Sequence, residues 1–110
     1  MNITTEEIKN TIVIQINEER LDAHNSGELK AEVQSLFEKG KLSLLIDLKT
    51  VRFIDSSGLG ALVSGFKNAT TNHGTLKLSS LQPQVKSMFE LTRLHRVFEI
   101  FPTVADALEG

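Results

Sequence analysis

The feature that most restricts the fold of this chain is the apolar segment Leu42–Leu48, which lies between two segments with the spacing of amphipathic helices. A strand that is apolar at nearly every position is covered on both faces, and the neighbouring helices can supply that cover. The helix before it is expected over Asn25–Lys39, where Asn25 and Glu28 form the pattern of a capping box. Its apolar stripe consists of Leu29, Val33, Leu36 and Phe37. We therefore expect Leu42–Leu48 at the centre of a sheet, with this helix, ending at Gly40, packed against it.

Two strand-like segments come before this helix. Thr11–Asn17 is rich in β-branched residues and has isoleucine at every second position, as expected of a half-buried strand. Ile3–Ile8 is a weaker strand candidate, and the two residues Lys9 and Asn10 between these segments fit a hairpin turn. The first two strands are therefore predicted to pair antiparallel at an edge of the sheet.

The rest of the chain alternates helix and strand. The expected elements are a helix from the residues after Asp55 to near Asn72, a strand over 75–78, a helix that opens at Pro83, a strand over 97–101, and a capped helix that begins at Thr103. Gly60 and Gly65 are expected to let the first of these helices approach the sheet closely. All six phenylalanines fall at positions expected to face the core.

This order of elements predicts an α/β fold, with a small mixed β-sheet that has an antiparallel N-terminal edge and packs against about four α-helices. The chain has 110 residues and 40% hydrophobic content, which is enough for one core and too little for two. We therefore expect one domain over residues 1–110.

A strand end that runs directly into a helix is the most informative candidate site. The segment Val51–Ile54 is followed by Asp55, Ser56, Ser57 and Gly58, and then by the helix. The first N–H groups of a helix have no partner within it, so Asp and Ser are favoured there as caps, and negative charge is favoured too. One interpretation is that a serine simply caps the helix, and another is that a serine at this place carries a phosphate.

The segment Asp55–Gly60, with the sequence DSSGLG, resembles the signature of bacterial anti-sigma factor antagonists, the free-standing members of the STAS domain family. The order of the expected elements, including the step Leu21, Asp22 and Ala23 before the first helix, is similar to that family over nearly the whole chain. At two positions the chain departs from the family: Arg20 stands where glycine is usual, and His24 where tyrosine is common. The resemblance implies the STAS fold.

The resemblance also implies the roles of single residues and partners. It assigns phosphorylation to Ser56 and places Asp22 in the loop beside that site. The partner-binding surface that it implies consists of Asp22, Asp55, Ser57, Gly58, Leu59 and Gly60. The implied partners are an anti-sigma factor that is also a serine-protein kinase, and a PP2C-type phosphatase. The unphosphorylated form is expected to bind the anti-sigma factor and so release the sigma factor, whereas the phosphorylated form does not bind.

Other functions remain as alternatives. The same family includes small soluble subunits of a lipid-transport ABC system, in which the serine need not be modified. A serine hydrolase is less favoured, because its nucleophile elbow needs glycine two positions before the serine, and Ile54 stands there before Ser56. The glycine pattern of a dinucleotide site is incomplete, since Val63 stands at its third position. The three histidines share no metal-ligand spacing, so we expect no metal, no cofactor and no catalytic residue.

Composition and charge narrow the partners further. The formal net charge is −2 and the charged residues are scattered, which does not indicate direct binding of nucleic acid. The chain has no cysteine, which excludes disulfides and thiolate metal sites. No apolar run approaches the roughly 20 residues that span a membrane, and the first residues do not fit a signal peptide. We therefore expect a soluble, cytoplasmic protein without a membrane span, which disfavours the tail of a membrane transporter.

Overall fold

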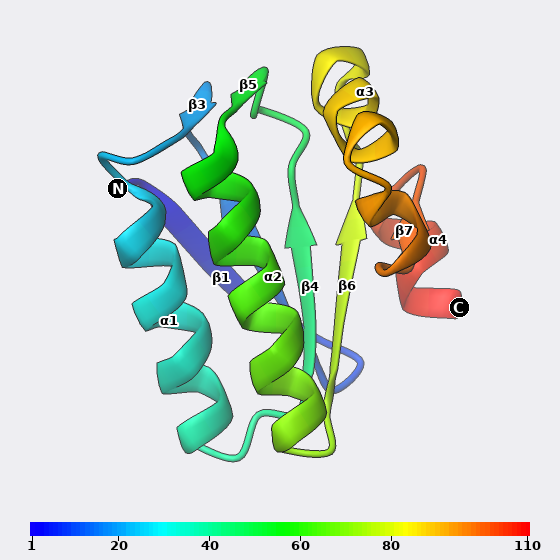
Figure 1. Ribbon diagram of the computed structural model, residues 1–110. Coiled ribbons are helices and arrows are strands. Elements are labelled where there is room, and N and C mark those ends of the chain that lie inside the picture. Colours follow the sequence, from blue (N-terminus) through cyan, green and yellow to red (C-terminus); the bar gives the residue numbers. More distant parts are fainter.

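The computed structural model describes residues 1–110, which form a five-stranded sheet in the order β1-β2-β4-β6-β7 (Figure 1). The strands of this sheet are β1 Ile3–Ile8, β2 Thr11–Ile16, β4 Ser43–Asp47, β6 Thr75–Ser79 and β7 Ile100–Phe101. β1 pairs antiparallel with β2, and every other pair in this sheet is parallel. The predicted mixed sheet with an antiparallel N-terminal edge is confirmed, and β4 is its central strand.

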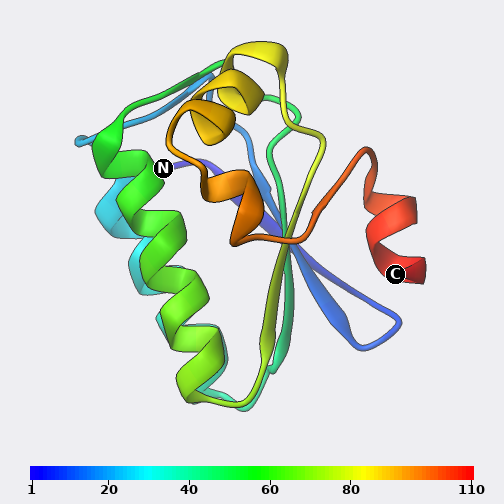
Figure 2. The same ribbon diagram turned by 45° about the vertical axis from the view of Figure 1, so that its right-hand side comes forward.

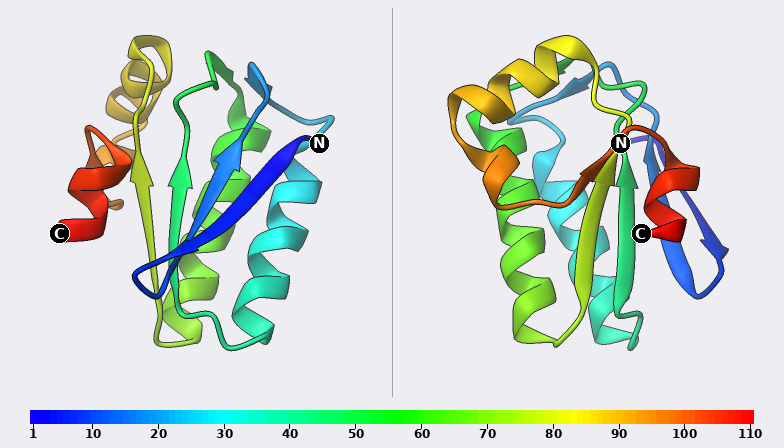
Figure 3. Two further views of the ribbon diagram at one scale, coloured as in Figure 1. Left: turned by 180° about the vertical axis from the view of Figure 1, so that it is seen from behind. Right: turned by 90° about the vertical axis from the view of Figure 1, so that its right-hand side faces the viewer.

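The helices are distributed unequally over the two faces of the sheet. Their bounds are α1 Ser26–Glu38, α2 Ser56–Thr71, α3 Pro83–Leu91 and α4 Val104–Glu109, with a 3₁₀ turn, η1, at Leu94–Arg96. α1 and α2 lie side by side on one face, with α3 above the carboxyl ends of the strands on the same side (Figure 2). Only α4 lies on the opposite face, where it packs on β4, β6 and β7 and reaches Val13 of β2, while the outer part of the β1–β2 hairpin stays uncovered (Figure 3). None of the helices is long and apolar enough to cross a membrane.

Most of the core lies between the sheet and the pair α1 and α2. Leu44 and Ile46 of β4 point into this cluster, whereas Leu45 points to the other face and packs with Val13 and Ala107 of α4. β4 is therefore buried on both faces, as predicted from its apolar sequence. The prediction that β2 is half-buried is wrong at Val13, because the C-terminal helix covers this part of the sheet from behind.

The segment before β7 departs from the sequence prediction. A strand was expected over 97–101, but only Ile100 and Phe101 pair with β6. Arg93 adopts a left-handed backbone conformation with φ of 62°, and the chain then forms η1, so Val97 ends a turn and is exposed. β-branched and aromatic residues favour strands in general, but here Phe98 is buried in edge-to-face contact with other phenylalanine rings, which holds the segment in an irregular path.

Of the predicted helix caps and of the glycines predicted to lie close to the sheet, some are confirmed by the structure and some are wrong. The predicted capping box of α1 is wrong, because the side chain of Asn25 caps no helical N–H. The cap predicted at Thr103 is confirmed, since its hydroxyl accepts a hydrogen bond from the Asp106 N–H at 3.1 Å. Gly65 lies close to the sheet, where an added Cβ would come within 3.1 Å of Leu76 Cδ2, but Gly60 faces open space, so its predicted close approach is wrong.

Candidate functional site

Two short strands bring distant parts of the chain together at one end of the molecule. β3, Arg20–Leu21, pairs in parallel with β5, Phe53–Ile54, as a separate two-stranded sheet. The Asp55 N–H continues this pairing and donates to the Leu21 carbonyl at 3.3 Å. Both strands lie beside the N-terminal ends of α1 and α2 (Figure 1). The loop that carries Asp22 and the start of α2 are therefore neighbours, as the resemblance implied.

The start of α2 presents two free hydroxyls. Asp55 is the N-cap, and its Oδ1 accepts a hydrogen bond from the Gly58 N–H at 2.9 Å. The interpretation that a serine caps this helix is therefore wrong, because the aspartate before it does so. Ser56 and Ser57 occupy the first two helical positions, both are exposed, and neither hydroxyl forms a hydrogen bond within the protein. The Ser56 oxygen is therefore accessible to a modifying enzyme.

The residues that follow hold the helix start in place. Gly58 is buried against β3, and a Cβ at this position would overlap the Leu21 carbonyl oxygen and the Ile54 side chain. Leu59 points into the core and is 7% exposed, whereas Gly60 is exposed. Of the six residues expected on the partner surface, Gly58 and Leu59 thus contribute by positioning α2, and the other four reach the surface at least in part.

The Asp22 loop is ordered by its own hydrogen bonds. Asp22 Oδ1 accepts from the His24 N–H at 3.0 Å, and the Asp22 N–H donates to Asn25 Oδ1 at 2.9 Å. Asn25 also donates from Nδ2 to the Arg20 carbonyl at 2.8 Å, so it braces the loop instead of capping α1. The His24 hydrogen bond, helped by Arg20, holds the pKa of Asp22 below its usual range. Asp22 is therefore an ordered negative charge in this loop, and Arg20 Nε lies 3.4 Å from its Oδ2 as its ion-pair partner.

Phe53, next to this site, does not face the core, so the prediction for the six phenylalanines is wrong at this position. Phe53 is 49% exposed, because β5 pairs only with β3 and its outward side chain has no sheet behind it. The Arg20 guanidinium carbon lies 4.3 Å from the centre of the Phe53 ring. A small hollow of about 270 Å³ separates Phe53 from Met88 of α3. In the sequence, Arg20 stands out only as a departure from the family pattern, and nothing there predicts that it stacks on Phe53.

The arrangement around Ser56 lacks the contacts of a catalytic nucleophile. An activated serine is hydrogen-bonded to a base that a third group orients. No histidine is hydrogen-bonded to Ser56, and His95 instead contacts the Phe89 carbonyl through Nδ1 at 3.3 Å. No cluster of three histidine, aspartate or glutamate side chains forms a metal site. What the site offers is an exposed hydroxyl at a helix N-terminus, directly after the Asp55 carboxylate, with the Asp22 loop held at the same end of the molecule by the pairing of β3 with β5.

Comparison with known proteins agrees with this geometry. A family model described as the STAS domain matches residues 2–107. The anti-sigma-B factor antagonist of Bacillus subtilis (strain 168) is 34% identical over 101 residues, which cover 91% of this chain and 92% of that protein. The crystal structure of TM1081 from Thermotoga maritima superposes with a TM-score of 0.92 at 27% identity, covering 97% of this chain and 92% of that one. The Bacillus cell fate determinant SpoIIAA in its phosphorylated form has a TM-score of 0.76 at 20% identity, covering 98% of this chain and 97% of that one.

Proposed function

Because the chain belongs to the STAS domain family, we propose that it is an anti-sigma factor antagonist that switches partners through phosphorylation of Ser56. In the unmodified form, the surface around Ser56 binds an anti-sigma factor that is also a serine-protein kinase, and the sigma factor is released. Phosphorylation of Ser56 by that kinase ends the association, and a PP2C-type phosphatase restores it. The domain itself is regulatory, with no catalytic residue and no cofactor.

The observation that carries the proposal is the exposure of the unbonded Ser56 hydroxyl at the first position of a helix of 16 residues. A phosphate adds a charge of about −1.5 to −2, and the positive end of a helix dipole favours negative charge. Asp55 already satisfies the Gly58 N–H, so the phosphate need not replace a cap. The protein is therefore expected to accept the modification without a change of fold.

The partner is expected to respond differently. Asp55 already places one carboxylate next to Ser56, and a phosphate would add more negative charge at the same point of the surface. Burying that charge in an interface costs desolvation free energy, and an acidic or apolar partner surface offers no interaction that offsets this cost. Phe53 adds an exposed apolar ring at the edge of this region, which suits burial in a protein interface. Phosphorylation should thus act on the association and not on the folding of the domain.

The relatives support this reading. The Bacillus subtilis protein is named an anti-sigma-B factor antagonist, and SpoIIAA has a phosphorylated form. These proteins are named as regulators and not as enzymes. The same role in this chain requires that its own serine be modified and that its own partner respond.

The modification is tested by incubating the protein with ATP and the anti-sigma factor kinase of its host, followed by mass spectrometry of the labelled peptide. We expect phosphate on Ser56 only, with labelling lost in Ser56→Ala and kept in Ser57→Ala. Because both serines are exposed and neither is a cap, the two variants are matched in structural cost. Labelling confined to Ser57 would contradict the assignment.

The switch is tested by affinity capture from host lysate with Ser56→Ala and Ser56→Asp as baits. We expect Ser56→Ala to retain an ATP-binding protein of the anti-sigma factor class that Ser56→Asp does not retain. Ser57→Asp adds the same charge one residue away on the same expected surface, so its retention shows whether the effect requires the charge at position 56 itself. Equal retention by Ser56→Ala and Ser56→Asp would contradict the proposed switch.

A further inference from the structure

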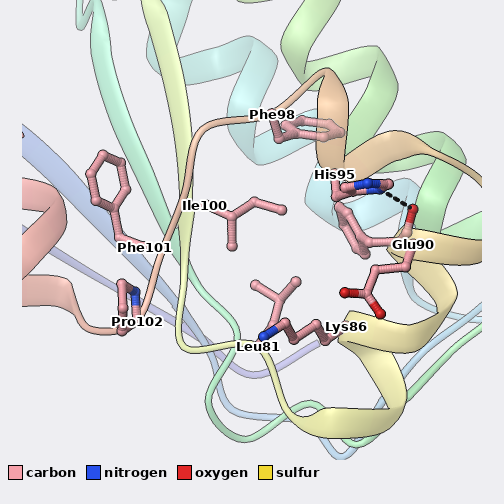
Figure 4. A pocket seen from close by; sticks show the side chains of 9 residues that line it. Leu81, Lys86, Glu90, His95, Phe98, Ile100, Phe101 and Pro102 are labelled. Atoms are coloured by element: carbon pink, nitrogen blue, oxygen red, sulfur yellow. Dashed lines mark hydrogen bonds between the residues drawn. The ribbon is translucent and has the colours of Figure 1, made fainter.

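A pocket lies away from Ser56, between α3, η1 and β7 (Figure 4). Its volume is about 620 Å³, which falls within the range of about 300–1,000 Å³ typical of small-molecule sites. α3 separates this pocket from the hollow beside Phe53, since Lys86, Phe89 and Glu90 line the pocket and Ser87 and Met88 line the hollow. The proposed switch uses none of the residues that line it.

The floor of the pocket is apolar and well fixed. Phe89 and Phe98 are 0% and 5% exposed, and their rings meet edge to face with centroids 5.8 Å apart. Leu81, Ile100 and Phe101 are half-buried and extend the apolar lining, and Pro102 and the exposed His95 lie at its border. Such a surface favours a ligand with a planar or branched apolar body, because apolar area that leaves water on binding is the main source of affinity.

The rim of the pocket carries two opposite charges that do not pair with each other. Lys86 and Glu90 lie one turn apart on α3, a spacing at which opposite charges can form an ion pair. The ion pairs of the molecule involve other residues, so both charged groups are free. Figure 4 shows both side chains extending from α3 toward the space in front of Leu81 and Ile100. A carboxylate beside Lys86 and an ammonium beside Glu90 would complement them together.

We propose that this pocket binds a free α-amino acid with a large apolar side chain, an aromatic one above all. The side chain lies against Phe98, Leu81 and Ile100, the carboxylate faces Lys86, and the ammonium faces Glu90. A carboxylic acid without an ammonium group would bring its negative charge close to the carboxylate of Glu90. An amine without a carboxylate would leave the Lys86 ammonium without an opposite charge. A ligand that carries both groups next to an apolar body complements the floor and both rim charges together.

The test is to titrate small molecules into the ¹⁵N-labelled protein and to monitor its backbone amide signals by NMR. The probes are L-phenylalanine, 3-phenylpropionate, which lacks the ammonium, 2-phenylethylamine, which lacks the carboxylate, and glycine, which lacks the apolar body. We expect saturable shifts confined to α3, η1 and β7 with L-phenylalanine. Each analogue should bind at least about fivefold more weakly, as expected for losing one partly exposed charge contact or the apolar contact.

Two variants test which charged group of the ligand is bound by Lys86 and which by Glu90. Lys86→Met should weaken the binding of L-phenylalanine but not that of 2-phenylethylamine. Glu90→Gln should weaken the binding of L-phenylalanine but not that of 3-phenylpropionate. Lys30→Met and Glu38→Gln on the exposed surface of α1 are the matched controls and should change nothing. Absence of shifts at millimolar L-phenylalanine, or equal affinity for all three aromatic probes, would overturn the proposal. These outcomes do not depend on whether Ser56 is phosphorylated.

Discussion

The starts of α1 and α2 lie side by side at one end of the molecule, yet they use their cap residues in opposite ways. At α2, Asp55 binds the Gly58 N–H and leaves the hydroxyl of Ser56 free. At α1, Asn25 forms no side-chain cap and instead holds the preceding loop through Asp22 and Arg20. One start presents a modifiable group, and the other fixes the charged loop beside it. A helix start can therefore serve either the helix or its surroundings, depending on where the cap side chain finds its partner.

The largest effect is expected at Gly58, where the start of α2 lies against β3 and β5. Gly58→Ala places a Cβ where the Leu21 carbonyl and the Ile54 side chain already lie, so β3 and α2 must separate. We expect a loss of about 1–3 kcal/mol in the free energy of unfolding, measured by urea denaturation. Gly60→Ala is the control, since its Cβ meets open space and alanine favours a helix by up to about 1 kcal/mol. Equal loss in both variants would show that Gly58 is not a packing constraint.

Removal of the α2 cap should have the next largest effect. Asp55→Ala leaves the Gly58 N–H without its partner and is expected to cost about 1 kcal/mol in the free energy of unfolding. Asp55→Ser should recover most of this loss, because serine is also a good N-cap. If Asp55→Ala were as stable as the parent, Ser56 would have to take over as the cap, and its hydroxyl would no longer be free.

The same change at α1 should act on the loop and not on the helix. Asn25→Ala removes the two hydrogen bonds that brace Asp22 and Arg20, for a net loss of about 0.5–1 kcal/mol at this half-exposed position. Hydrogen exchange should accelerate at the Asp22 amide, while the amides in the middle of α1 keep their protection. Faster exchange throughout α1 would mean that Asn25 supports the helix itself.

The smallest effect is electrostatic and concerns Asp22. An NMR titration should give this carboxyl a pKa below the ordinary value of about 3.9, mainly because it accepts the His24 N–H. Since the folded-state pKa is the lower one, the stabilisation is present above about pH 4 and is lost as the pH falls through the folded value. His24→Ala keeps the backbone donor and should leave the pKa low, whereas His24→Pro should raise it. An unchanged pKa in His24→Pro would assign the shift to Arg20.

Sequence patterns that extend over many residues predicted the main strands and helices, whereas segments of two residues were too short to be predicted. The apolar run of β4 and the stripes of α1 and α2 each extend over enough residues to show a period, and they placed the sheet and its helical cover correctly. β3 and β5 have two residues each, too few to show any period, so their pairing was not predictable. Without that pairing, nothing revealed that Phe53 is exposed or that Arg20 stacks on it.

The candidate site could be found but not resolved in detail from the sequence. Asp55, Ser56 and Ser57 are all good cap residues, so sequence alone could not decide which of them binds the helix and which stays free. The choice depends on backbone geometry: Asp55 is extended, with φ of −108° and ψ of −174°, and its carboxylate reaches the Gly58 N–H. The role of Asn25 was missed for the same reason, because its partners lie in the loop before it.

The central claim is that the domain accepts a phosphate on Ser56 and its partner does not. The most direct measurement uses protein with phosphoserine installed at position 56, compared with the unmodified chain for both urea unfolding and affinity toward the purified anti-sigma factor. We expect the free energy of unfolding to stay within about 1 kcal/mol, while the affinity falls at least about tenfold. Unfolding of the phosphorylated domain, or binding as tight as that of the unmodified chain, would contradict the account.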